Sequence, residues 1–328
     1  MTQTMKAWRV HQWGEPETMT FEDVPIPEPT RGEVRIRVSA AALNFFDILQ
    51  VQGKYQIKPP FPFTPGAEVA GVVDAVGPGA PGFQRGDAVI SLTHGGGFAE
   101  YVIGPERRNF RLPKGMDLAT GAAIPVVYQT SYYALKDRAA LRPGEWLLVH
   151  AGASGVGISA IQIGRAWGAH VIATAGSEEK LQFAKANGAD HVLNYNDAAW
   201  VDRVKELTNG RGADVIYDPV GGDVFDLSTK CIAPGGRLLV IGFASGRIPS
   251  IAANRILLKN ISIVGAVWGG HVQAHPGYAA DTQDALAEMF EKGQIHPPKP
   301  TVYSLNAAPV ALRDLANRQI LWKAVLEP

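Results

Sequence analysis

Residues 146–157 read WLLVHAGASGVG, an apolar run typical of a strand that ends in a glycine-rich turn. Residues 158–167 follow with apolar side chains at helical spacing. A strand, a tight turn and a helix are what a dinucleotide phosphate needs, because the helix N-terminus offers unpaired N–H donors and glycine lets the backbone approach closely. The glycine spacing departs from G-x-G-x-x-G, so a plain turn stays the alternative. The turn residues that we predict to bind the cofactor are Gly152, Ala153, Ser154, Gly155, Val156 and Gly157.

Length and composition are those of a globular protein with room for two domains. The chain has 328 residues, of which 46% are hydrophobic and 19% are charged. Lys+Arg and Asp+Glu both number 31, so there is no basic surplus to attract nucleic acid or anionic lipid. The one cysteine, Cys231, excludes an intrachain disulfide and a multi-cysteine metal site, and we expect it in the core. No secretory signal or membrane span is recognisable, so we expect a cytoplasmic protein.

The pattern of apolar residues changes along the chain. Residues 1–120 carry short β-rich runs between proline and glycine loops, which predict a β-rich unit. From about 125 to 265, six apolar strands alternate with helices, which is typical of a doubly wound parallel sheet covered on both faces. The six strands are expected at 146–151, 170–176, 190–195, 214–221, 236–243 and 261–267. The helices are expected at 155–167, 178–187, 198–207, 224–231, 282–292 and 308–320. The overall prediction is an α/β protein.

The end of the second strand predicts a preference for NADP(H) over NAD(H). The residue about 20 positions after the glycines of a dinucleotide fold sets this preference, and here it is Ser177. No carboxylate stands there to bond a free ribose 2′-hydroxyl, whereas Ser177 and Lys180 can bind a 2′-phosphate. Glu178 and Glu179 follow at a helix N-terminus, where acids are favoured in any case. A solvated surface lysine is the alternative for Lys180. Tyr195, which ends the third strand, is predicted either to pack against the adenine or its phosphate or to be a strand-end aromatic.

Six segments spread over nearly the full length carry a joint resemblance to a known family. They are AALNFFDILQVQGKY (41–55), PFTPGAEVAGVV (62–73), GGFAEYV (96–102), LLVHAGASGVG (147–157), ADVIYDPVGG (213–222) and GGRLLVIGFASG (235–246). Together they resemble the medium-chain dehydrogenase/reductase superfamily in its zinc-free, zeta-crystallin-like quinone oxidoreductase branch. The resemblance implies a discontinuous GroES-like catalytic domain of residues 1–124 and 268–328 around a Rossmann NADP-binding domain of residues 125–267. It also implies a homodimer through the apolar edge strand 261–267.

The residues expected for a zinc centre are missing. Where zinc alcohol dehydrogenases of this superfamily have a cysteine and a Gly-His-Glu, this chain has Asn44 and Gly66-Ala67-Glu68, and it lacks their four-cysteine lobe. Zn²⁺ needs three or four N, S or O ligands. Among the eight histidines only His271 and His275 have i, i+4 spacing, and the neighbouring glycines and proline make a helix there improbable. We therefore predict no metal site and a structural, hydrogen-bonded role for Glu68.

Without a metal, the resemblance implies direct hydride transfer to a quinone or to the β-carbon of an enone, with hydrogen-bond donors at the polarised oxygen. It places Asn44 and Thr130 near the nicotinamide and its ribose, and Tyr55 at the substrate pocket as a donor. A loop-capping Asn44 and a packing role for Tyr55 are the alternatives. The residues expected to line the nicotinamide slot, because they lie just past parallel strands, are Gly242, Phe243, Val267 and Trp268.

The C-terminal tail resembles the family in part. Arg318 falls where the family supplies an arginine to the 2′-phosphate, so we predict that it binds the cofactor. The family pattern continues with glycine before lysine, whereas here Trp322 precedes Lys323. This difference calls into question the geometry of the tail around Arg318.

Two other functions stay open at this point. One is reduction of an enoyl-CoA thioester, which needs a basic groove. A basic run of Arg107, Arg108, Arg111 and Lys114 is present, but we favour a solvated loop as its explanation. The other is a binding or crystallin-like protein that holds NADPH without chemistry. The balanced charge and the absence of an RNA-binding motif argue against RNA as a partner.

Overall fold

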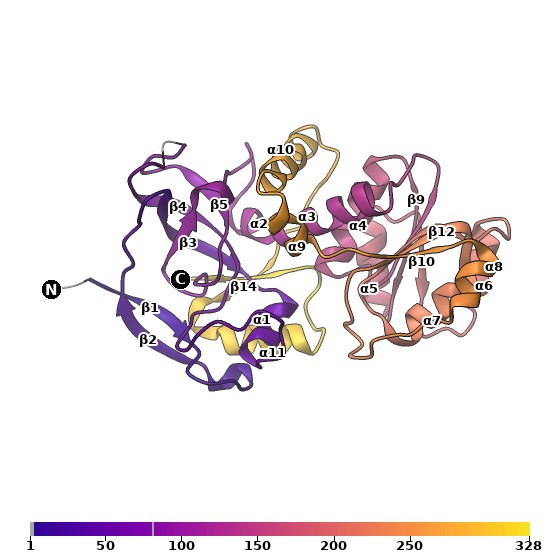
Figure 1. Ribbon diagram of the computed structural model, residues 1–328, viewed down its shortest axis with the longest axis horizontal. Coiled ribbons are helices and arrows are strands. Elements are labelled where there is room, and N and C mark those ends of the chain that lie inside the picture. The colour runs from indigo at the N-terminus through magenta and orange to yellow at the C-terminus, as the bar shows by residue number, and fades with distance from the viewer. Residues whose placement is uncertain (1–2, 81) are drawn as a thin grey trace. The chain divides into compact units, whose positions relative to one another are not determined.

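The computed structural model describes residues 3–80 and 82–328 (Figure 1). The chain forms two compact units, one of Met1–Val126, Pro276–Ala287 and Pro298–Pro328 and the other of Val127–His275 and Glu288–Pro297. Compared with the expected division, residues 125–126 fall in the first unit and residues 268–275 and 288–297 in the second. No helix among the described residues is long and apolar enough to cross a membrane.

The first unit is built on an antiparallel hairpin and a seven-stranded sheet that is antiparallel except for one parallel pair at its edge, Thr301–Ser304 with Ala324–Glu327. An N-terminal hairpin pairs β1 (Thr4–Arg9) with β2 (Thr20–Pro25). A seven-stranded sheet has the order β14-β15-β3-β4-β5-β7, with β6 also pairing β3. Its strands are β3 (Glu33–Ala42), β4 (Glu68–Val76), β5 (Ala88–Leu92), β6 (Tyr101–Pro105), β7 (Asn109–Arg111), β14 (Thr301–Ser304) and β15 (Ala324–Glu327). Alternate residues of β3 enter the core, which fits a sheet with one covered face.

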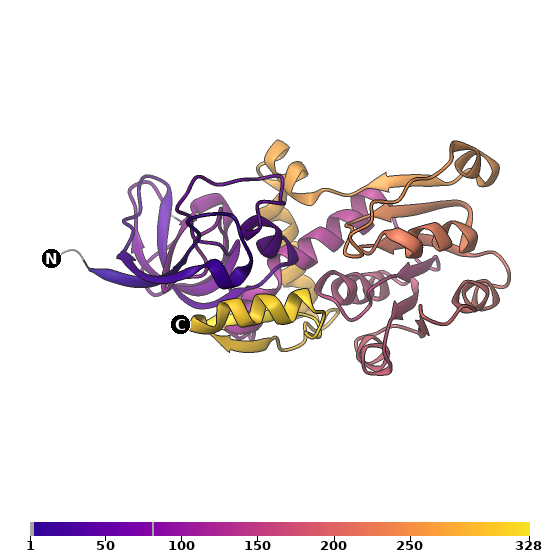
Figure 2. The same cartoon turned by 90° about the horizontal axis from the view of Figure 1, so that it is seen from below.

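Short helices cover this sheet. They are α1 (Phe45–Val51), α2 (Leu118–Ala123), α11 (Ala308–Ala316) and the 3₁₀ turns Pro16–Thr18, Glu106–Arg108 and Leu305–Ala307. Figure 2 shows α11 beside β14, so the C-terminal segment packs within the first unit. The longer α10 (Tyr278–Glu291) begins in the first unit and ends in the second.

The second unit holds a six-stranded parallel sheet of order β10-β9-β8-β11-β12-β13. Its strands are β8 (Trp146–Val149), β9 (His170–Ala175), β10 (His191–Asn194), β11 (Ala213–Asp218), β12 (Ile232–Val240) and β13 (Ser262–Gly265). Its helices are α3 (Pro125–Tyr133, which starts at the unit boundary), a π-helix (Ala134–Arg138), α4 (Gly155–Ala166), α5 (Glu178–Ala186), α6 (Trp200–Leu207), α7 (Gly222–Cys231), α8 (Ala253–Lys259) and α9 (Trp268–Ala274). The chain order reverses between β8 and β11, where a doubly wound sheet binds its ligand.

Helices lie on both sides of this sheet, with α4 and α5 on one side and α6, α7 and α8 on the other (Figure 1). Leu147, Leu148 and Val149 of β8 are therefore fully buried. The predicted α/β architecture, with a β-rich unit and a doubly wound parallel sheet, is confirmed.

One local prediction is wrong, because residues 268–274 form the helix α9 where we expected none. Gly269 and Gly270 lie in its first turn, and Pro276 follows the helix instead of interrupting it. The backbone N–H groups of a first turn have no partner within the helix, and a proline past the last turn removes no helical bond. The position of glycine and proline relative to the helix ends decides their effect.

Candidate active site

The glycine-rich turn of the second unit joins the end of β8 to the start of α4. Ser154 caps the helix by accepting a hydrogen bond from the N–H of Gly157, at 3.2 Å. A Cβ at Gly157 would lie 2.2 Å from the backbone oxygen of Ala151, and one at Gly152 would lie 2.9 Å from the Cβ of Ala173. The turn therefore accepts only glycine at these positions, and the 12-residue helix behind it directs its free N–H groups outward. These features fit a dinucleotide pyrophosphate.

The residues predicted to choose the cofactor gather at the end of β9. Ser177 caps α5, and its Oγ accepts a hydrogen bond from the backbone N–H of Lys180 at 3.4 Å. A Cβ at Gly176 would lie 2.6 Å from the hydroxyl of Tyr195, so that ring packs on the strand end. No carboxylate stands at Gly176 or Ser177, and the acids of this segment, Glu178 and Glu179, belong to the first turn of α5. Ser177, Lys180 and Tyr195 thus share one edge of the sheet.

Other predicted cofactor residues follow neighbouring strands of the same sheet. Gly242 and Phe243 come after β12, and the adjacent Ala244 donates its N–H to the oxygen of Pro219 at 3.0 Å. Phe243 is 41% exposed and Val267, which precedes α9, is 64% exposed. These exposed segments after parallel strands lie where such sheets bind ligands. The indole nitrogen of Trp268 is buried and has no hydrogen-bond partner among the described residues.

Two buried polar networks support this edge, and the sequence did not reveal either. His150 lies between Thr174 and Ser228, with its ring nitrogens 2.8 and 2.7 Å from their hydroxyls. Burial lowers the pKa of His150 to about 3, so the ring is neutral and bridges the two hydroxyls. In the other network the hydroxyl of Ser131 contacts those of Ser159 and Tyr217, at 2.7 and 2.9 Å.

Thr130 immediately precedes that second network. It is half-buried in α3 of the second unit. Asn44 and Tyr55, the other two predicted catalytic residues, belong to the first unit.

The first unit contains a buried ionic cluster around Asn44. We use this name for Asn44, Asp47, Glu68 and Lys323, whose side chains are each at most 6% exposed. The Asn44 amide donates to Glu68 at 2.8 Å, and the Lys323 ammonium donates to Glu68 at 2.6 Å and to the Asn44 side-chain oxygen at 2.8 Å. The third Lys323 donor bonds the oxygen of Leu43 at 2.6 Å, so the ammonium is fully satisfied.

Asp47 is the second carboxyl group of the ionic cluster, and its burial disfavours the ionised form. Burial raises its pKa to about 7, the Asn44 backbone N–H at 2.7 Å and the Lys323 charge oppose this rise, and Glu68 adds to it. The backbone N–H of Gly66 also opposes the rise. Asp47 therefore exchanges a proton close to neutral pH.

Replacing Asp47 by asparagine is expected to change how stability depends on pH. Because the folded pKa of about 7 exceeds the ordinary 3.8, the folded protein holds this proton more tightly than the unfolded chain. The proton on Asp47 contributes fully to the free energy of unfolding below about pH 4. This contribution is lost as the pH rises to about 7, and the free energy of unfolding then falls by at most about 1.4 kcal/mol per pH unit. Asp47→Asn removes this slope, so urea denaturation should find the variant more stable than wild type at pH 8 and not at pH 5.

The matched control for this measurement is Asp202→Asn, at a 74% exposed carboxylate paired with Lys205. It should leave the pH dependence unchanged. Parallel curves for Asp47→Asn and wild type from pH 5 to pH 8 would contradict the assignment to Asp47.

Tyr55 lies close to the ionic cluster. Its half-buried ring stacks on Phe46 with centroids 5.5 Å apart. Burial, followed by the charge of Asp47, raises the pKa of Tyr55, so the hydroxyl keeps its proton at neutral pH and can act as a donor. Packing and donation are compatible for this side chain. Asn44 likewise combines the capping position of α1 with its place in the cluster.

The backbone conformation of the C-terminal tail explains why the family has a glycine before the lysine that corresponds to Lys323. Trp322 has a φ of 59°, in the left-handed region that glycine adopts freely and bulky residues avoid, and it is 2% exposed. The helix α11 ends at Ala316, earlier than we predicted, and Arg318 just past its cap also has a φ of 59°. It lies in the first unit, whereas the glycine-rich turn lies in the second. The bulky residue is accommodated and Lys323 still reaches Glu68.

No group of three or more His, Cys, Asp or Glu side chains that could hold a metal ion occurs among residues 3–80 and 82–328. His271 and His275 stack on each other, with ring centroids 4.2 Å apart. Burial raises the pKa of Cys231 to about 12, so this thiol stays protonated.

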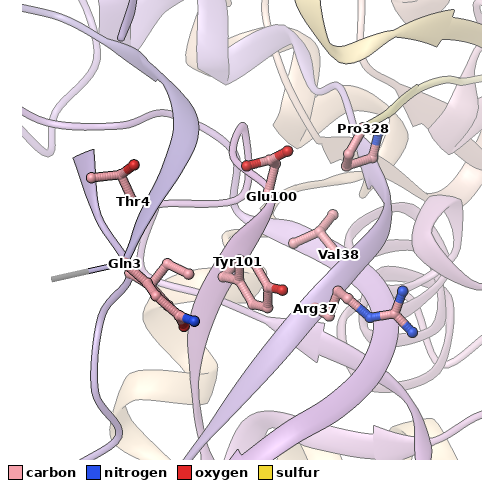
Figure 3. Close-up of a pocket in the computed structure, with 8 residues that line it drawn as sticks. Gln3, Thr4, Arg37, Val38, Glu100, Tyr101 and Pro328 are labelled. Atoms are coloured by element: carbon pink, nitrogen blue, oxygen red, sulfur yellow. The ribbon is translucent and has the colours of Figure 1, made fainter. Parts of the chain in front are cut away.

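A separate hollow of the first unit is drawn in Figure 3. Its lining comes from β1, β3, β6 and the end of the chain, with Arg37, Glu100 and Tyr101 among the labelled residues. It includes no member of the ionic cluster.

Comparisons with known proteins agree with this architecture. Residues 30–114 match the family described as alcohol dehydrogenase GroES-like domain, and residues 155–290 match the family described as zinc-binding dehydrogenase. The chain is 35% identical to the human quinone oxidoreductase over 316 residues, which cover 95% of this chain and 94% of the relative. The chain belongs to the quinone oxidoreductase family of medium-chain dehydrogenases/reductases.

Two further relatives support this membership. A quinone oxidoreductase-like protein 2 homolog of Nematostella vectensis is 38% identical over 297 residues, or 90% of this chain and 81% of the relative. The Escherichia coli quinone oxidoreductase, solved in complex with NADPH, has a TM-score of 0.91 and 28% identity, and the match covers 98% of this chain and all of the other. The family resemblance inferred from the six sequence segments is confirmed.

Proposed function

We propose that this protein is a zinc-independent, NADPH-dependent oxidoreductase that transfers a hydride to a quinone or to an α,β-unsaturated carbonyl. The observation that carries this proposal is the turn 152–157, where a Cβ at Gly152 or Gly157 would lie 2.9 Å or 2.2 Å from a neighbouring atom, and which lies beside a β9 end that lacks a carboxylate. In a member of the quinone oxidoreductase family, such a site suits a phosphorylated dinucleotide. The cofactor, when bound, supplies the hydride, and the E. coli relative is complexed with NADPH.

The charges of the first unit support zinc independence. The ammonium of Lys323 already neutralises Glu68 and contacts Asn44, which stands where zinc-dependent members of the superfamily have a cysteine. A second cation there would be repelled. Asn44 and Tyr55 supply N–H and O–H donors instead, and we assign to them the polarisation of the acceptor oxygen. Thr130 is assigned to the nicotinamide ribose.

The test is a side-by-side turnover assay with NADPH and three acceptors, namely a 1,2-quinone, an alkenal and crotonyl-CoA. The expected result is rapid oxidation with the quinone or the alkenal, unchanged by a strong zinc chelator. Turnover with the thioester alone would replace the proposal by an enoyl-CoA reductase. Tight NADPH binding without turnover of any acceptor would instead favour a non-catalytic protein.

Lys180 gives a direct test of cofactor choice. Replacing it by alanine is expected to raise the dissociation constant of NADPH about tenfold, since a charge-assisted contact contributes about 1–3 kcal/mol, and to leave that of NADH unchanged. Nucleotide fluorescence titrations measure both constants. The control is Lys230→Ala, at an exposed lysine in the last turn of α7. An equal loss for the two cofactors would exclude a role at the 2′-phosphate.

We also propose a homodimer that pairs the edge of the second sheet. β13 is an edge strand, and α8 before it buries no residue and leaves Leu257 and Leu258 74% and 79% exposed. An apolar edge of this kind favours pairing with its copy. The double variant Leu257→Glu/Leu258→Glu is expected to be monomeric by light scattering, whereas the wild type and Val302→Glu, a control at a 51% exposed valine, are dimers. A monomeric wild type would exclude this assembly.

Cytoplasmic location stays a prediction.

A further inference from the structure

The buried ionic cluster determines which way the Asn44 carboxamide points. A lysine ammonium can only donate hydrogen bonds, and an ionised glutamate can only accept them. With Lys323 at 2.8 Å on one side of the carboxamide and Glu68 at 2.8 Å on the other, the oxygen must face Lys323 and the nitrogen must face Glu68. The opposite orientation would set donor against donor and acceptor against acceptor. One N–H of Asn44 is thus bound to Glu68, and the second has no hydrogen-bond acceptor among the described residues.

We infer that Lys323 is a positioning residue for the reaction: through Asn44 and Glu68 it holds the second N–H of Asn44 as the donor to the acceptor oxygen of the substrate. This inference rests on the proposed function. It goes beyond that function because it assigns a role to a residue 279 positions from Asn44 that need not touch substrate or cofactor.

The contacts of Lys323 exceed what a purely structural ion pair requires. Glu68 is already bonded to the backbone N–H of Val126 at 2.8 Å, and the ammonium neutralises its charge. The additional contact with the Asn44 oxygen adds no charge compensation. It restricts a side chain that could otherwise rotate by half a turn at little cost in shape. The other titratable groups recorded at this place are Asp47 and Tyr55, which interact electrostatically with each other.

A pair of variants separates positioning from folding. Glu68→Gln keeps an oxygen that can accept from Asn44 and keeps the Lys323 ammonium. Because it leaves that buried ammonium without its counter-ion, circular dichroism must show a native fold before it serves as the reference for the kinetic comparison. Lys323→Met/Glu68→Gln removes both charges together and leaves no buried unpaired ion, but it takes the donor from the Asn44 oxygen. Comparing the double variant with Glu68→Gln isolates the effect of Lys323.

The expected kinetic result is a loss of about 10–100-fold in kcat for the double variant relative to Glu68→Gln, with an unchanged dissociation constant for NADPH. Lys323→Arg, which keeps a charged donor, should retain more of kcat than the double variant. Equal kcat values for the double variant and Glu68→Gln would overturn the inference.

A second readout does not depend on turnover. In ¹⁵N-labelled wild-type protein, the side-chain NH₂ of Asn44, assigned by its disappearance in Asn44→Asp, is expected to exchange slowly with solvent. It should exchange faster in the double variant. An Asn44 amide that exchanges in the wild type as fast as an exposed asparagine overturns the inference, even if the double variant does not fold. If the wild type reduces no acceptor, the proposed function fails while this measurement still decides how Asn44 is held.

Discussion

Replacing Lys323 alone by methionine is expected to lower the free energy of unfolding by about 3–5 kcal/mol. The ammonium is 4% exposed, and its partner Glu68 is fully buried. Without the ammonium, Glu68 is left as an uncompensated charge, and Asn44 and the oxygen of Leu43 each lose a donor. The contact with Leu43 also ties the start of β15 to the end of β3, so the loss extends to the packing of two strands. Urea denaturation at neutral pH measures the change.

Two comparisons make this prediction specific. Lys292→Met, at a 60% exposed lysine paired with Glu288, should change stability by less than about 0.5 kcal/mol. Adding Glu68→Gln to Lys323→Met should restore most of the lost stability, because the unpaired charge is then gone. A loss below about 1 kcal/mol for Lys323→Met would mean that the ion pair contributes no more than one at the surface.

Gly157→Ala is expected to abolish productive binding of both NADPH and NADH. The new Cβ would lie 2.2 Å from the oxygen of Ala151, which is backbone and cannot rotate away. The turn must shift, and the N–H groups aimed at the pyrophosphate shift with it. Losing two hydrogen bonds to a charged group costs about 3–6 kcal/mol, which raises both dissociation constants by about 100-fold or more. Fluorescence titration of the two nucleotides measures the effect.

The pattern across cofactors distinguishes this variant from Lys180→Ala. Gly157→Ala should weaken both nucleotides equally, because they share the pyrophosphate, whereas Lys180→Ala should weaken NADPH alone. Gly277→Ala is the control, at a glycine with no heavy atom within 4 Å of the added Cβ. Circular dichroism should show native helix content for Gly157→Ala. Unchanged affinity for both nucleotides would exclude the turn as the phosphate site.

Most of the second unit could be predicted from sequence because its signals are local. The apolar runs of β8, β9 and β11 are continuous, the helices between them have a 3.6-residue period, and glycines mark the turn at 152–157. The predicted end of α11 at residue 320 lies past its end at Ala316, because position 318, where the backbone is left-handed, is an arginine and not a glycine or asparagine. The helix α9 was missed because its glycines lie in the first turn, where they cost little.

The sequence by itself determined the family and the α/β architecture and predicted the turn 152–157 as the phosphate site, since each rests on short local motifs. Only the tertiary structure showed that Lys323 meets Asn44 and Glu68, from which it is 279 and 255 positions distant. It alone placed His150 between two hydroxyls and showed Trp322 in a backbone conformation suited to glycine. A buried charge must find its partner wherever the fold brings one, and no spacing along the sequence records that distance.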